Sequence, residues 1–373
     1  PNRNCRISTL ILKGNWKTAV ISDKPLKMLV LSLTGRCNFA CKYCYAEAHS
    51  QNMMSLDTAV QAVDLAAANG EPFILQFSGG EPLMAYNLMQ EIIHYVRQRG
   101  IRAIMQVQTN ASLLSRERVS YLRKAKVGIG ISLDGRPKIN DQLRCLPNGK
   151  GTSCQIVRGA GYLAALGVEI GITCVIANEN VNQLAGIVEM AHYLGNVRRI
   201  GFDLLRRQGR GKRLTPPPAE VVAAGVLEAL RTAEKLARFT GQSMVISQLE
   251  RVEKLARKRV SRGFGHCHAM NGEAAFVDAR GRIYACSSLV GDEDFRLGDV
   301  SEGIDKARQQ AVMELIQNSM AFCLECPDFT LCGGGCFSRW YGSGCIDKAY
   351  EAECALKKVC IRWYQQHLEE TGT

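Results

Sequence analysis

Three cysteines lie close together near the start of the chain, in Cys37-Asn-Phe-Ala-Cys41-Lys-Tyr-Cys44. This spacing allows their thiolates to bind three irons of one [4Fe–4S] cube, which leaves the fourth iron without a ligand from the chain. An open iron can be chelated by the amino and carboxylate groups of S-adenosylmethionine, and a low-potential cluster can then release a 5′-deoxyadenosyl radical from it. A zinc knuckle is the alternative, because zinc sites also use closely spaced cysteines.

A second group of cysteines fills the C-terminal third, where nine of the sixteen lie after Gly265. Cys267 precedes a Gly-x4-Cys segment that ends at Cys286, and the run Cys323-x2-Cys326-x5-Cys332-x3-Cys336 is followed by Cys354. The first residues carry no apolar signal-peptide core, so we expect a reducing, cytoplasmic location. Short spacings in such a chain favour Fe–S or metal ligation over disulfides, with zinc ribbons as the alternative.

Glycines and polar residues follow successive predicted strands. Gly79, Gly80 and Glu81 come after the second strand. The two glycines let the backbone approach a ligand closely, and the carboxylate can accept a hydrogen bond from an ammonium group. Asn110 follows the third strand, and Ser132 and Asp134 end the fourth, where polar side chains suit ribose and methionine recognition. Ordinary turns or caps are the alternative at each position.

Strand and helix patterns alternate along the first two thirds of the chain. We predict strands over 28–33, 73–77, 101–108, 127–133, 168–176 and 198–204, with helices over 55–68, 86–99, 115–124, 155–166 and 181–194. Such alternation with short links gives parallel strands and right-handed crossovers. The predicted fold class is therefore α/β, a partial (β/α)6 barrel with functional residues at the carboxyl ends of its strands.

Composition shifts divide the chain into four parts. We expect a lead-in over 1–27, the partial barrel over 28–215, a basic helical linker over 216–265 and a small cysteine-rich domain over 266–373. Three consecutive prolines, Pro216 to Pro218, mark the end of the barrel pattern. With 46% apolar and 22% charged residues the chain is not globally disordered, and no apolar run is long enough to span a membrane.

The net charge of +12 is concentrated in one segment. Between Asn196 and Gly263 there are 16 Lys and Arg against 6 Asp and Glu. One interpretation is a solvated helical face and linker; the other is a binding surface for an acidic peptide, a cofactor carboxylate or nucleic acid. Aromatic residues are not interleaved through the segment, so a nucleic-acid partner is disfavoured.

The first motif resembles that of the radical SAM superfamily: Cys-x3-Cys-x2-Cys with Tyr43 before the last cysteine, followed by Gly-Gly-Glu-Pro. The resemblance covers about 28–205. It implies that Cys37, Cys41 and Cys44 hold the cluster, that the Tyr43 backbone lies near the adenine, and that Gly79, Gly80 and Glu81 meet the methionine amine. It further makes Ser132 and Asp134 ribose-side contacts and Arg144 a candidate for the methionine carboxylate.

The C-terminal cysteines resemble the SPASM domain. That resemblance implies two auxiliary [4Fe–4S] clusters, and so three clusters in all: one held by Cys267, Cys286 and Cys336, the other by Cys323, Cys326, Cys332 and Cys354. No further cysteine lies in 268–272. The first auxiliary cluster therefore either keeps an open iron or takes another residue as its fourth ligand. Cys345 is the first candidate for that ligand, followed by His266 and His268. An open iron there can bind a substrate thiolate, which favours thioether chemistry. The catalytic residue is not identified from the sequence; Cys345 is the candidate.

The resemblance implies a peptide-modifying enzyme. We expect a ribosomal-peptide maturase that forms a thioether or carbon–carbon crosslink or an epimer, with a peptide or protein substrate, a flavodoxin or ferredoxin as electron donor, and a partner protein or another surface for leader recognition. Sulfatase maturases carry an Asp directly after the Gly-x4-Cys cysteine, where this chain has Ser287, which argues against that branch. Two further hypotheses are a nucleic-acid-modifying enzyme and a non-catalytic metal-stabilised scaffold. His49 is expected to be a surface or packing residue.

Overall fold

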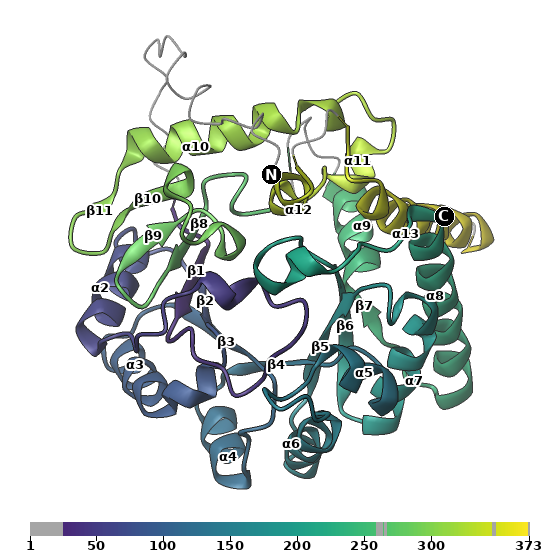
Figure 1. The fold of residues 1–373 in the computed structure, drawn as a ribbon, viewed down its shortest axis with the longest axis horizontal. Helices are drawn as coiled ribbons and strands as arrows, with labels where there is room; N and C mark the ends of the chain where they lie inside the picture. The colour runs from purple at the N-terminus through teal and green to yellow at the C-terminus, as the bar shows by residue number, and fades with distance from the viewer. Residues whose placement is uncertain (1–24, 259–263, 265–266, 345–347, 372–373) are drawn as a thin grey trace.

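Six parallel strands form the partial barrel. The computed structural model describes residues 25–258, 264, 267–344 and 348–371, and Figure 1 shows the strands surrounded by helices. The barrel strands are β1 (Met28–Ser32), β2 (Phe73–Ser78), β3 (Ala103–Thr109), β4 (Gly128–Ser132), β5 (Ile170–Ile176) and β6 (Val197–Leu204). Each pairs in parallel with the next, so the predicted (β/α)6 arrangement is confirmed.

Helices on the outside connect the strands, as right-handed crossovers require. They are α2 (Leu56–Ala67), α3 (Tyr86–Gln98), α4 (Arg116–Lys124), α6 (Ser153–Ala165) and α7 (Leu184–Leu194). Ser55 and Ser115 cap α2 and α4, because each side chain accepts a hydrogen bond from the backbone N–H three residues later. The sequence did not predict the short helix α5 (Pro137–Leu143), which ends directly before Arg144.

The C-terminal region extends the same sheet. Strand β8 (Ala274–Val277) pairs in parallel with β1, with Met28 opposite Ala274. Three short antiparallel strands follow: β9 (Arg282–Tyr284), β10 (Arg296–Asp299) and β11 (Gly303–Ile304). With β7 (Val245–Ile246) beside β6, the sheet has eleven strands in the order β11-β10-β9-β8-β1-β2-β3-β4-β5-β6-β7. The cysteine-rich region is therefore hydrogen-bonded, through β8, to the first barrel strand.

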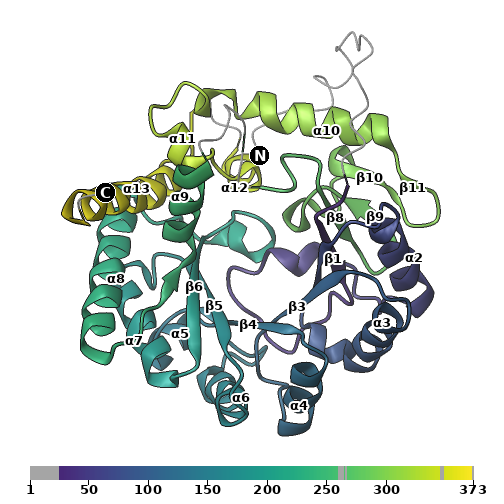
Figure 2. The same ribbon diagram turned by 180° about the vertical axis from the view of Figure 1, so that it is seen from behind.

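The remaining helices cover the barrel and its open side. They are α8 (Ala219–Thr240), α9 (Ser247–Lys258), α10 (Lys306–Ser319), α11 (Phe329–Cys332), α12 (Phe337–Gly342) and α13 (Glu351–Thr371). The reverse view shows α13 against α8 and α9, and α10 across the side of the ring between β8 and α11 (Figure 2). Among the described residues, no helix combines the length and apolar character needed to cross a bilayer.

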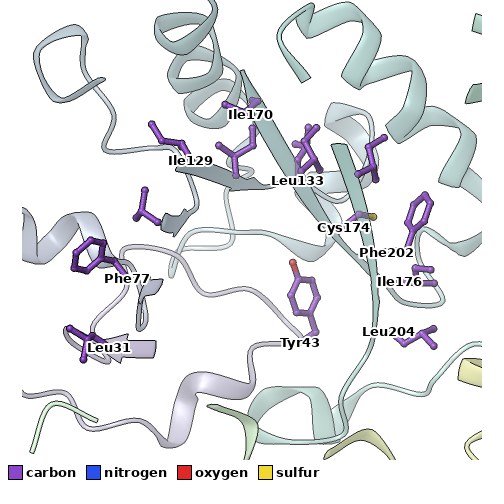
Figure 3. Packing of buried hydrophobic residues seen from close by; sticks show 14 of the residues in the cluster. Leu31, Tyr43, Phe77, Ile129, Leu133, Ile170, Cys174, Ile176, Phe202 and Leu204 are labelled. Atoms are coloured by element: carbon purple, nitrogen blue, oxygen red, sulfur yellow. The ribbon is translucent and has the colours of Figure 1, made fainter. Parts of the chain in front are cut away.

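Alternating burial along the strands places apolar side chains between the sheet and its helices. In β2 and β5 every second residue is buried, as a strand period of two requires. In Figure 3 the ring of Tyr43 lies between the strand that carries Phe77 and the strand that carries Cys174. Tyr43 comes from the loop after β1, so one residue of the cysteine motif belongs to the core.

Candidate active site

Two neighbouring segments hold the loop that carries Cys37, Cys41 and Cys44. On one side, Ala40 N–H donates to the carbonyl of Cys145 at 2.7 Å and Lys42 N–H donates to that of Leu143 at 2.9 Å. On the other side, the segment after β6 contributes Arg210, whose backbone N–H donates to the Cys44 carbonyl and whose Nε donates to the Cys41 carbonyl, at 3.0 and 2.9 Å. The cysteine loop is thus fixed by its backbone, independently of its thiols.

The three thiols share one poorly solvated space. Chiefly because of burial, the pKa of Cys37 is raised to about 11 and that of Cys41 to about 12; the charge of Cys44 contributes to both rises, and that of Arg144 opposes them. Cysteines ligate metals as thiolates. A metal that binds here must therefore displace the thiol protons of these cysteines, as iron does. Closely spaced sulfur donors in a site that excludes water fit an Fe–S cluster.

A cavity of about 190 Å³ opens beside this loop, at the carboxyl ends of the strands. Its lining contains seven of the residues expected to bind S-adenosylmethionine, besides the three cysteines: Tyr43, Gly79, Gly80, Glu81, Asn110, Ser132 and Arg144. Such a gathering at one edge of parallel strands is the usual position of a ligand in α/β folds. The structure therefore brings the predicted cysteines and the predicted nucleotide-binding residues to one site.

The two glycines allow a close approach of backbones. Gly79 has φ of +135°, and a Cβ on it would lie 2.2 Å from the carbonyl oxygen of Thr34. A Cβ on Gly80 would lie 2.3 Å from the carbonyl oxygen of Arg36. Only glycine fits at either position, so the segment after β2 lies directly against the residues that lead into Cys37.

Glu81 is buried, and three hydrogen bonds hold its carboxylate in place. Its Oε1 accepts from Leu83 N–H at 3.0 Å and from the Thr109 hydroxyl at 2.6 Å, and its Oε2 accepts from Asn110 N–H at 2.8 Å. Burial raises its pKa, while these bonds oppose the shift. A cationic ammonium in the cavity would supply the missing counter-charge.

Asp134 and Arg144 form a buried ion pair behind Tyr43. Arg144 Nε lies 2.9 Å from the Asp134 carboxylate, the Tyr43 hydroxyl donates to the same oxygen, and Val175 N–H donates to the other oxygen at 2.8 Å. The carboxylate is thus already occupied and is not among the residues that line the cavity. Arg144 does line it, with Nη1 3.8 Å from Cys41 Sγ.

Three charged residues in the cavity were not among the predicted site residues: Asp203, Arg206 and Arg210. Asp203 lies in β6, one position before its last residue, where a strand-end carboxylate was a recognisable signal. The two arginines belong to the basic segment between Asn196 and Gly263, whose position in the fold no local pattern predicts. Burial alone would raise the pKa of Asp203, but the charges of Arg206 and Arg339 outweigh it and hold that pKa well below its usual range.

The first predicted auxiliary set comes together next to the cavity. Burial is the largest cause that raises the pKa of Cys267 to about 11, and the neighbouring charges of Cys336 and Cys286 contribute to the same rise. Arg206 faces both this set and the cavity, because its charge acts on Cys286 while its side chain lines the cavity. The site of the first auxiliary set thus lies one side chain away from the S-adenosylmethionine cavity.

The second predicted set also converges. Cys323, Cys326, Cys332 and Cys354 line one small cavity with Lys357, and Cys336 of the first predicted set lines it as well. Burial is the main cause that raises the pKa of Cys354 to about 12, and the charges of Cys332 and Cys323 contribute to that rise. The cysteines thus come together as a donor set that fits Fe–S clusters, and their division between two clusters stays a prediction.

The expected fourth ligand of the first set is not described. Cys345 and His266 lie outside the described residues. His268 is described, and its Nδ1 lies 3.2 Å from the Glu273 carboxylate. Within the described part of the chain, no three side chains of His, Cys, Asp or Glu surround a point closely enough for a single metal ion.

Known proteins resemble this chain over most of its length. An uncharacterized protein of Methanocaldococcus jannaschii, MJ0907, is 31% identical over 268 residues, 71% of this chain and 86% of that protein. An AdoMet-dependent heme synthase of Nitratidesulfovibrio vulgaris is 26% identical, over 89% of this chain and 92% of its own. A serine-type anaerobic sulfatase-maturating enzyme of Klebsiella aerogenes is 26% identical, over 87% and 82%.

Solved structures share the fold. The sulfatase-maturating enzyme anSMEcpe with bound AdoMet and Cp18Cys peptide superposes with a TM-score of 0.78 at 20% identity, over 93% of this chain and 99% of that one. Streptococcus suis SuiB bound to its precursor peptide SuiA gives 0.61 at 14% identity, over 90% and 76%.

The fold and the site together define an enzyme built to use S-adenosylmethionine at a cysteine-held cluster. Residues 31–191 match the radical SAM superfamily, and the chain belongs to that superfamily. Its C-terminal region has the cysteine pattern of SPASM-type enzymes, as predicted from the sequence. Because the relatives carry enzyme names, the hypothesis of a non-catalytic scaffold is set aside.

Proposed function

We propose that this enzyme reductively cleaves S-adenosylmethionine to a 5′-deoxyadenosyl radical and abstracts hydrogen from a peptide or protein, as a ribosomal-peptide maturase. A [4Fe–4S] cluster with an open iron supplies the one-electron cleavage when it is bound. Cys37, Cys41 and Cys44 would hold that cluster. The chain's own part is to bind the nucleotide, keep water out and hold the substrate close to it.

Different residues of the cavity are proposed to bind different parts of S-adenosylmethionine. Glu81 offers a buried carboxylate to the methionine ammonium, and Gly79 and Gly80 let their backbone approach it. Arg144 is the proposed partner of the methionine carboxylate. Its guanidinium lines the cavity, and the ion pair with Asp134 holds it in position there. Asn110, hydrogen-bonded to Asn38 at 2.9 Å, and Ser132, which accepts from Gln108 at 3.0 Å, are the proposed ribose-side contacts.

The observation that carries the proposal is the shared wall between the cavity and the first auxiliary set. Arg206 faces both, so a substrate group in the cavity would lie beside Cys286 and Cys336. That arrangement suits chemistry in which a substrate meets the S-adenosylmethionine site and a second cluster together. Peptides are bound in the solved structures of anSMEcpe and SuiB, which have the same fold.

The proposed cofactors are S-adenosylmethionine and three [4Fe–4S] clusters, two of them auxiliary, with a low-potential flavodoxin or ferredoxin as electron donor. The test is anaerobic co-expression with a short peptide encoded beside the gene, followed by mass spectrometry of that peptide. A loss of about 2 Da for a crosslink, or deuterium uptake from D2O at an α-carbon for an epimer, is the expected result. An unchanged peptide in the presence of released 5′-deoxyadenosine contradicts the proposal.

A second candidate is a reaction on a tetrapyrrole. The heme synthase relative aligns over 89% of this chain and 92% of its own, so the likeness includes the cysteine-rich region. Incubation with an iron porphyrin, followed by chromatography of the pigment, separates the two candidates. Oxidation of a sulfatase is a third candidate; Ser287, at the position of the maturases' Asp, weighs against it.

A further inference from the structure

The segment between β6 and α8 carries five cations and no acid, in Arg-Arg-Gln-Gly-Arg-Gly-Lys-Arg over 206–213. Part of it forms the short helix η4 (Gly209–Arg213). A Cβ on Gly209 would lie 2.5 Å from the carbonyl oxygen of Cys44, and one on Gly211 would lie 2.2 Å from that of Arg206. The segment is therefore packed tightly against the cysteine loop and keeps its cations in fixed positions.

These cations line two adjoining hollows. Arg206 and Arg210 line the cavity at the cysteine loop. Arg207 and Lys212 line a groove of about 520 Å³ that shares Tyr45 with the cavity. The groove and the cavity thus adjoin at Tyr45; we call the two together the path, and both have cations in their lining.

Within the described part of the chain, only Arg206 of these four cations has an ion-pair partner. Among the described residues, no carboxylate forms an ion pair with Arg207, Arg210 or Lys212, and Arg210 Nε donates only to the neutral Cys41 carbonyl. Arg206 shares Asp203 with Arg339, and its buried Nε has no hydrogen-bond partner in the described structure. A buried donor without a partner is costly, and a bound ligand is one explanation for it.

Two acids, Asp292 and Glu293, also line the groove. Glu293 lies 3.4 Å from the guanidinium of Arg296, which does not line the groove and partly neutralises the Glu293 carboxylate. Asp292 accepts from the neutral Tyr341 hydroxyl at 2.8 Å and keeps its charge, so along the path it and Asp203 face four cations. The surplus of positive charge along the path is left for a ligand.

We propose that this path, lined by Arg206, Arg207, Arg210 and Lys212, binds the carboxylates of an acidic peptide segment and guides it to the cavity. The inference deepens the proposed function, on which it rests, by naming the substrate class. Carboxylates fit guanidinium groups with two parallel hydrogen bonds, which Arg207 and Arg210 are free to make. An acidic segment next to the modified residue would thus be recognised by the path itself.

The test uses the anaerobically purified holoenzyme and a fluorescein-labelled decapeptide of alternating glycine and glutamate, followed by fluorescence anisotropy. We expect binding that weakens strongly between about 50 and 300 mM NaCl, because the added salt shortens the Debye length by roughly half. The glycine–glutamine counterpart should not bind. The double variant R207Q/K212Q should weaken binding about three- to tenfold. The matched control R123Q/K124Q removes the same charge from the exposed end of α4 and should have no effect.

Three outcomes overturn the proposal. Equal weakening by the two double variants shows a general charge effect. Equal affinity for the glycine–glutamine and glycine–glutamate peptides shows that the path does not recognise carboxylates. The third is tighter binding of coproporphyrin III or of a short RNA than of the glutamate peptide. If the R207Q/K212Q variant also weakens that binding, the path binds a different anion.

The failure of this inference and of the proposed function can be told apart. If the glutamate peptide does not bind while the gene's neighbouring peptide is modified, the acidic path is wrong and the maturase function stands. If the glutamate peptide binds through Arg207 and Lys212 while no peptide is ever modified, the path stands and the maturase function is wrong.

Discussion

The guanidinium of Arg339, in α12, contacts the carboxylate of Asp203, at the end of β6. The same guanidinium donates to Glu353, in α13, at 2.8 Å, and Glu353 in turn accepts from the backbone N–H of Cys336 at 3.1 Å. One partly buried arginine therefore joins the barrel strand that lines the cavity to a cysteine of the first auxiliary set.

Removing this arginine should destabilise the protein strongly. In R339A, Asp203 and Glu353 lose a shared buried cation, and breaking such a pair costs about 3–5 kcal/mol. We expect a clear fall in the midpoint of anaerobic thermal unfolding. R198A breaks the exposed pair with Glu169 and should cost less than about 1 kcal/mol; equal falls for R339A and R198A would show that the buried network adds nothing.

Iron content should follow the three cysteine groups. Three [4Fe–4S] clusters give about twelve irons per chain. Each of the variants C37A/C41A/C44A, C267A/C286A/C336A and C323A/C326A/C332A should lose about four. The exposed Cys154 is outside all three groups, so C154S is the matched control and should lose none. Loss of about eight irons from any single-group variant contradicts the grouping.

Adding one methyl group to Gly79 should abolish S-adenosylmethionine binding. In G79A the new Cβ meets the Thr34 carbonyl at 2.2 Å, at a φ of +135° that side chains rarely adopt. Gly70 also has a positive φ, +66°, but open space around its Cβ position, so G70A controls for backbone strain alone. Equilibrium dialysis with labelled S-adenosylmethionine should show at least a tenfold weaker affinity for G79A than for G70A (about 1.4 kcal/mol), and equal affinities would remove Gly79 from the site.

Stability should fall as the pH drops from 7.5 to 5.5, in part because of His49. Burial lowers the pKa of this histidine, while its bond to the Ser287 carbonyl and the charge of Asp278 act in the opposite direction. A lowered pKa means that the unfolded chain binds the proton more readily, so the stabilisation is present above the ordinary histidine pKa and decreases below it.

The variant H49Q should therefore show a smaller fall in unfolding midpoint between these two pH values than the wild type. The exposed His94 serves as the control, because H94Q should keep the wild-type difference. An unchanged pH dependence in H49Q would mean that other groups account for the fall.

Much of the barrel could be predicted because its signals are local. Alternating strands and helices, the caps Ser55 and Ser115, and the glycines after β2 all depend on neighbours in the sequence. The membership of the two C-terminal cysteine groups comes from the resemblance to a known pattern and stays a prediction; the structure places Cys267 near Cys286 and Cys336, and Cys354 near Cys323 and Cys332.

Features that depend on distant partners could not be predicted in this way. The parallel pairing of β8 with β1 joins residues about 250 positions apart, which no local period encodes. Arg206 has no local signal in the sequence, and only the fold places it at the cavity with Asp203, which Arg339 contacts. His49 was expected to be a packing or surface residue; it is buried, and it also lines the groove.

The most direct measurement is the release of 5′-deoxyadenosine from S-adenosylmethionine by anaerobically purified protein reduced with dithionite. The account predicts that the wild-type protein releases this nucleoside, while C37A/C41A/C44A, purified and reduced in the same way, releases none. Wild-type protein that carries its full iron and releases no 5′-deoxyadenosine would contradict the account.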